Sequence, residues 1–279
     1  MSSSETAPTI GFIGAGNMAR SLAGGLVNNG HPRARILLAD PDAGQRAAIQ
    51  EYLGLTAHAD NQEVAGAAQV LVLAVKPQAL RAVAQALAPT VARSKPLIIS
   101  LAAGVRSGDL ERWLGAGLAI VRAMPNTAAL IGSGATGLYA NRACGEAERA
   151  TAESLLRAVG VTAWVEDEAL MDVVTALSGS GPAYFFLVME ALEAAAVHHG
   201  LDRKLARLLT LETAFGAAKM ALEGGEEPAR LRARVTSPGG TTEQALQVLE
   251  GGHLRPLFDR AIEAAMLRGR ELGQLLGKD

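Results

Sequence analysis

Short apolar runs alternate with stretches of helical periodicity from residue 9 to about residue 167. Each run is bounded by Gly, Pro, Asp or Asn, residues that favour turns at the ends of strands. We therefore predict strands at residues 9–13, 35–39, 70–75, 97–101, 119–123, 136–140 and 163–165. Strands that alternate with helices are typical of βαβ units, so this part of the chain is predicted to be an α/β domain with a doubly wound parallel sheet.

The pattern changes near residue 167 to long helical periods rich in Ala and Leu. Helices are predicted at residues 184–198, 204–222, 243–249 and 257–276. The predicted organisation is thus a Ser-rich disordered tail at 1–8, an α/β domain at 9–167 and an all-helical domain at 168–279. Residues 191–197 are apolar on more than one helix face, and such a helix is normally buried. A partner subunit could bury it, so we expect at least a homodimer.

Composition and charge narrow the functional classes. The chain has 279 residues, of which 49% are hydrophobic and 19% charged, and this suits a compact protein of about two domains. The formal net charge of −2 is spread without long runs of one sign, so neither nucleic acid nor an anionic membrane is an expected partner. Arg230, Arg232 and Arg234 are interpreted as a solvated helix face. Glu190 and Glu193 interrupt the apolar stretch at 185–197, so no bilayer-spanning segment is expected.

The cysteine content favours a reducing compartment. Cys144 is the single cysteine, so no intramolecular disulfide can form, and we expect a cytoplasmic protein. No basic residue pair that would activate this thiol is evident, and an inert cysteine is the favoured interpretation. No spacing of Cys and His is typical of a metal site, so no metal is predicted.

A glycine motif, Gly-Ala-Gly-Asn-Met-Ala at residues 14–19, follows the first predicted strand and opens a helix. Its first Gly permits a tight turn and its second lets the backbone approach a pyrophosphate, which the helix N-terminus then attracts. Asp40 closes the second predicted strand, where an acidic residue binds the ribose of a dinucleotide. These features predict a Rossmann-type site for NAD(H) or NADP(H). Alternatively, Asp40 merely caps the next helix with Pro41 at the first helical position.

Two further strand ends carry candidate residues for the nicotinamide half of this site, namely residues 74–77 and 101–103. Pro77 suits the first turn of a helix, and Lys76 has the equally plausible interpretation of a solvated lysine at a helix start.

In the helical half, residues 237–244 read Ser-Pro-Gly-Gly-Thr-Thr-Glu-Gln before an apolar helical stretch. Thr241 with Gln244 fits a capping box, and exposed N–H groups at such a helix start can hold an anion. A plain helix cap is the alternative. The segment at 178–182, Ser-Gly-Ser-Gly-Pro, leads into the predicted helix at 184–198 in a similar way and could be only a turn. No nucleophile–base triad is visible, so the chemistry is expected to come from a cofactor, as in hydride transfer.

The motifs at residues 11–19, 74–78, 122–127, 178–184 and 235–242 occur together in one order. With these motifs the chain resembles the pyrroline-5-carboxylate reductase family almost from end to end. The resemblance implies a Rossmann domain, then a helical domain that interlocks with a second subunit, and an active site between them. It implies hydride transfer from NADPH or NADH to the C=N carbon of 1-pyrroline-5-carboxylate, a cyclic imino acid, which gives L-proline in the last step of proline biosynthesis.

The resemblance also assigns roles to residues. Backbone N–H groups of Gly240, Thr241 and Thr242 would hold the substrate carboxylate, and the Thr242 hydroxyl would lie near the ring nitrogen as the catalytic group. The cofactor would be surrounded by Ile13, Gly14, Ala15, Gly16, Asn17, Met18, Asp40, Asn61, Ala74, Val75, Lys76, Pro77, Leu101, Ala102 and Ala103. The resemblance also implies a homodimer at least, and it leaves undecided whether dimers assemble into a larger ring.

Two departures from the family pattern stand out. Ala128 replaces a usual second proline, and Asp40 stands where a hydroxyl residue is common, which leaves the choice between NAD and NADP open. Two other functions are weighed against the reductase. A β-hydroxyacid dehydrogenase would share both domains but would show a catalytic lysine pattern that this chain lacks. A regulator that only binds NAD(P) would show no turnover in a steady-state assay.

Overall fold

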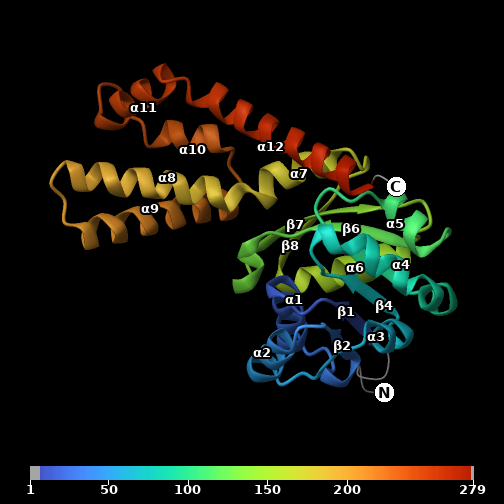
Figure 1. Cartoon of the computed structure of the whole chain (residues 1–279). Coiled ribbons are helices and arrows are strands. Elements are labelled where there is room, and N and C mark those ends of the chain that lie inside the picture. The colour runs from blue at the N-terminus through green and yellow to red at the C-terminus, as the bar shows by residue number, and fades with distance from the viewer. Residues whose placement is uncertain (1–6, 278–279) are drawn as a thin grey trace. The chain divides into compact units, whose positions relative to one another are not determined.

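The computed structural model describes residues 7–277 and divides into two compact units (Figure 1). Unit 1 consists of Met1–Ser180 and Ala264–Asp279, and unit 2 consists of Gly181–Glu263. The predicted tail at 1–8 lies outside the described residues except for its last two positions.

Unit 1 is built on an eight-stranded sheet with the strand order β3-β2-β1-β4-β5-β6-β7-β8. The strands are β1 (Ile10–Ile13), β2 (Ile36–Ala39), β3 (Ala57–His58), β4 (Val70–Leu73), β5 (Leu97–Ser100), β6 (Ile120–Met124), β7 (Gly134–Ala140) and β8 (Gly160–Trp164). The order reverses between β1 and β4, which is the position where open α/β sheets bind ligands beyond the carboxyl ends of their strands. The predicted doubly wound, Rossmann-type architecture is confirmed.

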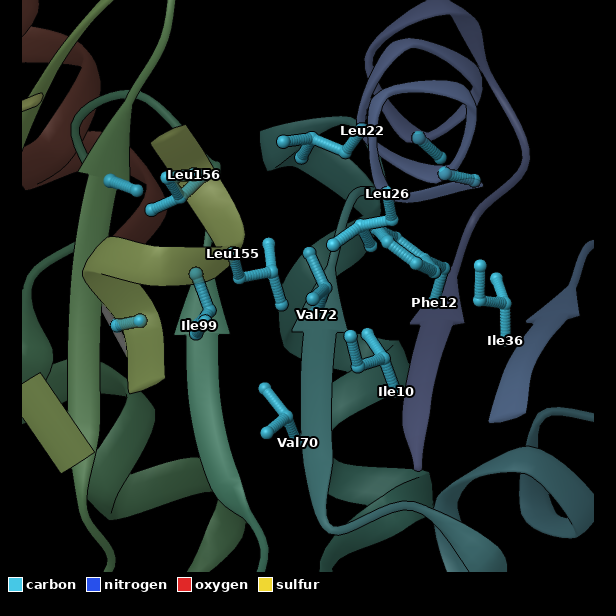
Figure 2. Packing of buried hydrophobic residues seen from close by; sticks show 14 of the residues in the cluster. Ile10, Phe12, Leu22, Leu26, Ile36, Val70, Val72, Ile99, Leu155 and Leu156 are labelled. Carbon is cyan, nitrogen blue, oxygen red and sulfur yellow. The ribbon is translucent and has the colours of Figure 1, made fainter. Parts of the chain in front are cut away.

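Helices cover both faces of this sheet. They are α1 (Asn17–Asn28), α2 (Ala43–Leu53), α3 (Asn61–Ala67), α4 (Pro77–Ser94), α5 (Ser107–Leu114), α6 (Glu146–Leu156) and α7 (Leu170–Val174), with short turns η1 (Arg33–Arg35), η2 (Thr127–Ile131) and η3 (Arg157–Val159) and a π-helical segment η4 (Thr175–Gly179). On one face Leu22 and Leu26 of α1 and Leu155 of α6 pack with Phe12 of β1 (Figure 2).

The opposite face has its own apolar cluster, in which Ile13 packs with residues of α3, α4 and α5. Alternate residues of β1 therefore enter different layers, because successive strand side chains point to opposite faces. Burial of a side chain such as Phe12 contributes about 1.5–3 kcal/mol, and the two layers together hold the strand ends in fixed register.

Two features of the sheet differ from the prediction. Strand β7 runs antiparallel to β6, so the sheet is not wholly parallel. The link at residues 125–133 contains only the short turn η2, and a parallel return needs a crossover of about a dozen residues or more. Strand β3 was not predicted, because its two half-buried residues carry no apolar run.

The helices of unit 2 are α8 (Gly181–His198), α9 (Arg203–Glu223), α10 (Pro228–Arg234), α11 (Thr241–Gly251) and the first part of α12 (Leu254–Gly277). Many apolar side chains of this unit are exposed, among them Phe186 at 64% and Phe215 at 65%. A monomer rarely exposes so many, so these faces indicate contact with a partner. Arg232 and Arg234 of α10 are exposed and form ion pairs with glutamates, which confirms the predicted solvated helix face.

One helical stretch, Leu170–His198, is long and apolar enough to cross a membrane by length and composition alone, since an 18-residue window within it has a mean hydropathy of 1.2. This finding does not by itself contradict the expectation that the chain has no bilayer-spanning segment. The sequence places a turn at residues 178–182, whereas α7, η4 and α8 run on as one continuous helical stretch. Length and composition are weak evidence for a membrane span, and Glu190 and Glu193 lie within this stretch.

Candidate functional site

Three predicted cofactor loops of unit 1 meet at the carboxyl edge of the sheet. Backbone hydrogen bonds link each loop to a neighbouring strand end: Gly14 N donates to Ala39 O at 2.8 Å, Ala74 N to Ile13 O at 2.8 Å and Leu101 N to Leu73 O at 3.1 Å. Residues 14–18, 74–77 and 101–103 are therefore brought together at the point where the strand order reverses.

The glycine turn after β1 has the form that a pyrophosphate requires. Gly14 has φ +98°, and a Cβ atom there would lie 2.8 Å from Ala74 O, so only glycine fits without strain. A Cβ on Gly16 would meet no heavy atom within 4 Å, which leaves the backbone open to a ligand. Within residues 7–277 the N–H groups of Asn17, Met18 and Ala19 find no hydrogen-bond acceptor. Together with the dipole of α1 these donors fit a phosphate group.

Asp40 binds the glycine turn instead of capping a helix. Its Oδ2 accepts a hydrogen bond from Ala15 N at 2.8 Å, and its Oδ1 accepts one from Asp42 N at 2.9 Å. Asp42 is the residue that caps α2, since it accepts hydrogen bonds from Gly44 N and Gln45 N. The alternative interpretation of Asp40 as the cap, with Pro41 at the first helical position, was wrong because α2 begins two residues later than it assumes.

Arg46 of α2 is also tied to this segment. Its Nη1 donates to Asp40 O at 2.8 Å and to Pro41 O at 2.9 Å. The guanidinium group thus fixes the backbone around Asp40, and both carboxylate oxygens of Asp40 are held by N–H groups. The carboxylate has a fixed position at the end of β2, the position that meets the adenosine ribose in dinucleotide folds.

The other predicted cofactor residues lie at the same edge. Asn61 is the first residue of α3, and its Oδ1 is buried without a hydrogen-bond partner among the described residues. A buried orphan acceptor is unusual and fits a ligand that donates to it. Lys76 is exposed and precedes α4, and Pro77 occupies the first turn of that helix as predicted. Ala102 is buried as a member of the apolar cluster that contains Ile13.

Two sequence motifs meet within unit 1 at Asn126. Its Nδ2 donates to Ser178 O at 3.1 Å, and its Oδ1 accepts from Ala135 N at 3.3 Å. A Cβ on Gly179 would lie 2.7 Å from Met124 Cε, so the two segments are in close contact. The π-helical turn η4 ends here, and π-helical turns often occur at functional sites. The sequence reasoning quoted both motifs but did not single out Asn126, although the Asn within the motif was a usable signal.

A cluster of charged residues connects the segment that contains Glu168 and α7 to the rest of unit 1. The sequence analysis did not predict this cluster. Glu168 accepts hydrogen bonds from Ser107 N at 2.6 Å and from Arg122 Nη1 at 3.0 Å. Burial lowers the pKa of the Arg122 guanidinium, while the charge of Glu168 acts in the opposite direction. Asp172 of α7 accepts from Arg106 at 2.6 Å. Asp172 is only 2% exposed, so its ion pair with Arg106 is a structural connection within unit 1.

The predicted carboxylate loop lies in unit 2 between α10 and α11. Helix α11 begins at Thr241 with Gly240 as its N-cap, so the predicted capping box of Thr241 with Gln244 was wrong. Gly240 N donates to Ser237 O at 3.0 Å, and Gly239, with φ +71°, donates its N–H to Glu243 Oε2 at 2.8 Å. Neither bond uses the backbone N–H groups of the first turn of α11.

The N–H groups of Thr241, Thr242 and Glu243 have no acceptor in the part of the chain that the structure describes. The hydroxyl of Thr242, a half-buried residue, likewise has no partner there. Unpaired donors at a helix N-terminus attract an anion, so this loop can hold a carboxylate next to a hydroxyl donor.

Metal and thiol chemistry receive no support from the described residues. Residues 7–277 contain no group of three His, Cys, Asp or Glu side chains that could hold a metal ion. Cys144 is half-buried, and burial raises the pKa of its thiol, which agrees with an inert cysteine.

Comparisons with known proteins cover nearly the whole chain. A family model described as pyrroline-5-carboxylate reductase dimerisation matches residues 168–272, and a model described as NADP oxidoreductase coenzyme F420-dependent matches residues 9–104. The chain is 51% identical over 271 residues to the pyrroline-5-carboxylate reductase of Pseudomonas aeruginosa, across 97% of this chain and 99% of that relative.

Solved structures give the same result. The pyrroline-5-carboxylate reductase of Coxiella burnetii matches with a TM-score of 0.91 at 47% identity, over 96% of this chain and 99% of that one. The Plasmodium falciparum pyrroline carboxylate reductase, solved with NADP bound, matches with a TM-score of 0.85 at 30% identity, over 95% and 98% of the two chains.

Proposed function

The chain belongs to the pyrroline-5-carboxylate reductase family, and from this premise we propose how its residues reduce the C=N bond of 1-pyrroline-5-carboxylate to L-proline. The family resemblance drawn from the motifs is confirmed, and so is the expected class of enzyme, an oxidoreductase of proline biosynthesis that uses NADPH or NADH. The observation that carries the site assignment is the set of unpaired N–H groups at the start of α11.

The cofactor is assigned to the carboxyl edge of the sheet in unit 1. Residues 13–18 meet the pyrophosphate, Asp40 and Asn61 meet the adenosine half, and residues 74–77 and 101–103 meet the nicotinamide half. The open donors of α1 and the orphan acceptor of Asn61 support this assignment. When bound, the reduced nicotinamide supplies the hydride that adds to the imine carbon.

The substrate carboxylate is assigned to Gly240, Thr241 and Thr242. The open N–H groups of α11 neutralise its charge without an arginine, because the helix dipole and the amide donors act together. The Thr242 hydroxyl donates a hydrogen bond to the ring nitrogen, which gains electron density as hydride reaches the adjacent carbon. The nitrogen takes up a proton from solvent, so that one hydride and one proton convert the C=N bond to the CH–NH group of L-proline. A fixed donor at an atom where charge develops stabilises the transition state more than the ground state.

The assembly is a homo-oligomer, in agreement with the dimerisation family match at residues 168–272. We assign the dinucleotide-binding domain to 9–167 and the substrate and dimerisation domain to 168–279, and the start of the family match supports this boundary. The compact units divide the chain differently, since residues 168–180 and 264–279 belong to unit 1. The exposed apolar faces of α8 and α9 support a homodimer, with a larger ring of dimers as the next level of assembly. The stretch Leu170–His198 falls inside the dimerisation match, so we assign its apolar surface to a subunit contact of a cytoplasmic enzyme and to no membrane.

Two assays test this function. The first measures oxidation of NADPH and of NADH with 1-pyrroline-5-carboxylate, and the second measures reduction of NADP+ and of NAD+ with a 3-hydroxyacid. We expect turnover with the imine alone. No turnover with either reduced cofactor would refute the reductase, and turnover of the hydroxyacid would favour the dehydrogenase alternative. A mass measurement in solution at micromolar concentration is expected to give a multiple of 28.8 kDa, and a monomeric mass would contradict the proposed assembly.

A further inference from the structure

Glu243 has an unusual place at the start of α11. It is the third residue of the helix, and a glutamate at this position commonly accepts the N–H of the N-cap residue. Here its Oε2 accepts the N–H of Gly239, one residue before the N-cap Gly240, at 2.8 Å. Gly240 N donates instead to Ser237 O at 3.0 Å. The side chain of Glu243 therefore holds the turn that precedes the helix.

With this bond in place, the backbone N–H donors of the loop fall into two groups, those with an acceptor and those without one. The N–H groups of Gly239 and Gly240 are used within the loop, whereas those of Thr241, Thr242 and Glu243 stay open within residues 7–277. Gly239 has φ +71°, a conformation that glycine adopts readily but does not prefer over others. Without an acceptor for its N–H, this glycine would be free to leave that conformation, and the open donors would lose their common direction.

Nothing else described in the chain holds the Glu243 carboxylate. Two arginines of α10 are engaged with other carboxylates: Arg232 pairs with Glu250 and Arg234 pairs with Glu226. Among the described residues, Glu243 forms neither an ion pair nor a side-chain hydrogen bond apart from that to Gly239. Among the described residues, the carboxylate of Glu243 therefore has one interaction, the hydrogen bond to Gly239 N in the loop assigned to the substrate.

We propose that Glu243 is a positioning residue for substrate binding: its carboxylate fixes Gly239 and thereby preorganises the N–H groups of Thr241 and Thr242 for the carboxylate of the imino acid. The inference rests on the proposed function, since it concerns the same loop. The role depends on an acceptor oxygen and not on negative charge, which near a substrate carboxylate is itself unfavourable. Preorganised donors bind ground state and transition state alike, so their loss affects KM more than kcat.

The test compares three variants of the full-length protein. Glu243→Ala removes the acceptor and keeps a strong helix former at this position. Glu243→Gln removes the charge and keeps an acceptor oxygen. Gln244→Ala is the matched control, since Gln244 is exposed and its side chain makes no hydrogen bond among the described residues.

We expect Glu243→Ala to raise KM for 1-pyrroline-5-carboxylate about tenfold, with kcat within about twofold of wild type and KM for the reduced cofactor unchanged. Glu243→Gln and Gln244→Ala are expected to behave like wild type. Amide hydrogen exchange at Gly239 is expected to be faster in Glu243→Ala alone. This combination is not expected from a general loss of stability, which would affect both substrates.

Three results would overturn the inference: an unchanged KM in Glu243→Ala, an equal rise of KM in Glu243→Gln, or unchanged exchange at Gly239 in Glu243→Ala. Failure of the proposed function is recognised separately, because wild type and Gln244→Ala would then show no turnover of the imine and no binding of L-proline. That outcome would refute the inference as well, whatever the exchange at Gly239.

Discussion

Replacement of Asp40 by serine tests which cofactor the chain prefers. The Asp40 carboxylate is fixed by the N–H groups of Ala15 and Asp42, at 2.8 and 2.9 Å, so it cannot turn away from a ligand at the end of β2. A carboxylate there accepts hydrogen bonds from the 2′-hydroxyl of NADH and repels the 2′-phosphate of NADPH. We expect Asp40→Ser to raise the NADPH-to-NADH ratio of kcat/KM.

The size of this effect follows from the position of the carboxylate. Two unit charges about 4 Å apart interact by about 1 kcal/mol in water and by about 4 kcal/mol at an effective dielectric constant of about 20. Asp40 is half-buried at the solvent edge of the sheet, so the lower part of this range applies. Relief of about 1.4 kcal/mol corresponds to a change of about tenfold in the ratio.

The assay is a steady-state measurement of kcat/KM with each cofactor at saturating 1-pyrroline-5-carboxylate, together with thermal unfolding. Asp42→Ala is the matched control: loss of the α2 cap destabilises the protein by about 0.5–2 kcal/mol but should leave the ratio unchanged. If the ratio in Asp40→Ser stays within error of wild type, Asp40 only supports the glycine turn and another residue sets the cofactor preference. If the control shifts the ratio equally, the effect comes from loop stability and the electrostatic reasoning is wrong.

Three further predictions concern single residues. Thr242→Ala should lower kcat/KM by roughly 10- to 1000-fold, about 1.4–4 kcal/mol, if its hydroxyl stabilises the ring nitrogen, and unchanged kinetics would reduce the loop to a plain cap. Gly16→Ala should raise KM for the cofactor with little change in Tm, because its new Cβ meets no protein atom, whereas Gly14→Ala should also lower stability by about 1–3 kcal/mol. Equal melting curves for these two variants would contradict the geometry of the turn. Cys144 should react with a disulfide reagent at neutral pH more slowly in the native than in the unfolded protein, since its raised pKa leaves less thiolate, and modification should leave activity intact.

The fold could be predicted from the sequence where buried strands appear as apolar runs. Strands β1, β4 and β5 are buried on both faces and consist almost entirely of apolar residues, so their positions were predicted within a few residues. Strand β3 has two half-buried residues and no such run. The direction of β7 could not be predicted from its residues, because an apolar strand has the same pattern whether it runs parallel or antiparallel.

The site residues could be predicted from the sequence where the ligand is expected to bind backbone N–H groups of a glycine turn. Glycines that permit a positive φ or a close approach, such as Gly14, are visible in the sequence and marked the cofactor turn. Contacts between side chains and distant loops were not visible. The bond of Asn126 to Ser178 and the ion pair of Arg122 with Glu168 join segments far apart in the chain, and no local spacing indicates them. The true helix starts at α2 and α11 were also missed, because several adjacent residues could have served as caps.

The two proposed ligand loops share one construction, although they lie in different units. In each loop an acidic side chain binds one N–H group of a glycine turn: Asp40 binds that of Ala15, and Glu243 binds that of Gly239. The next N–H groups, at the start of α1 and of α11, are left open for an anion. A carboxylate so close to an anion site is unfavourable electrostatically, so its presence needs a compensating role. Fixing the direction of the neutral donors is such a role, because donors that are already aligned lose little conformational freedom on binding.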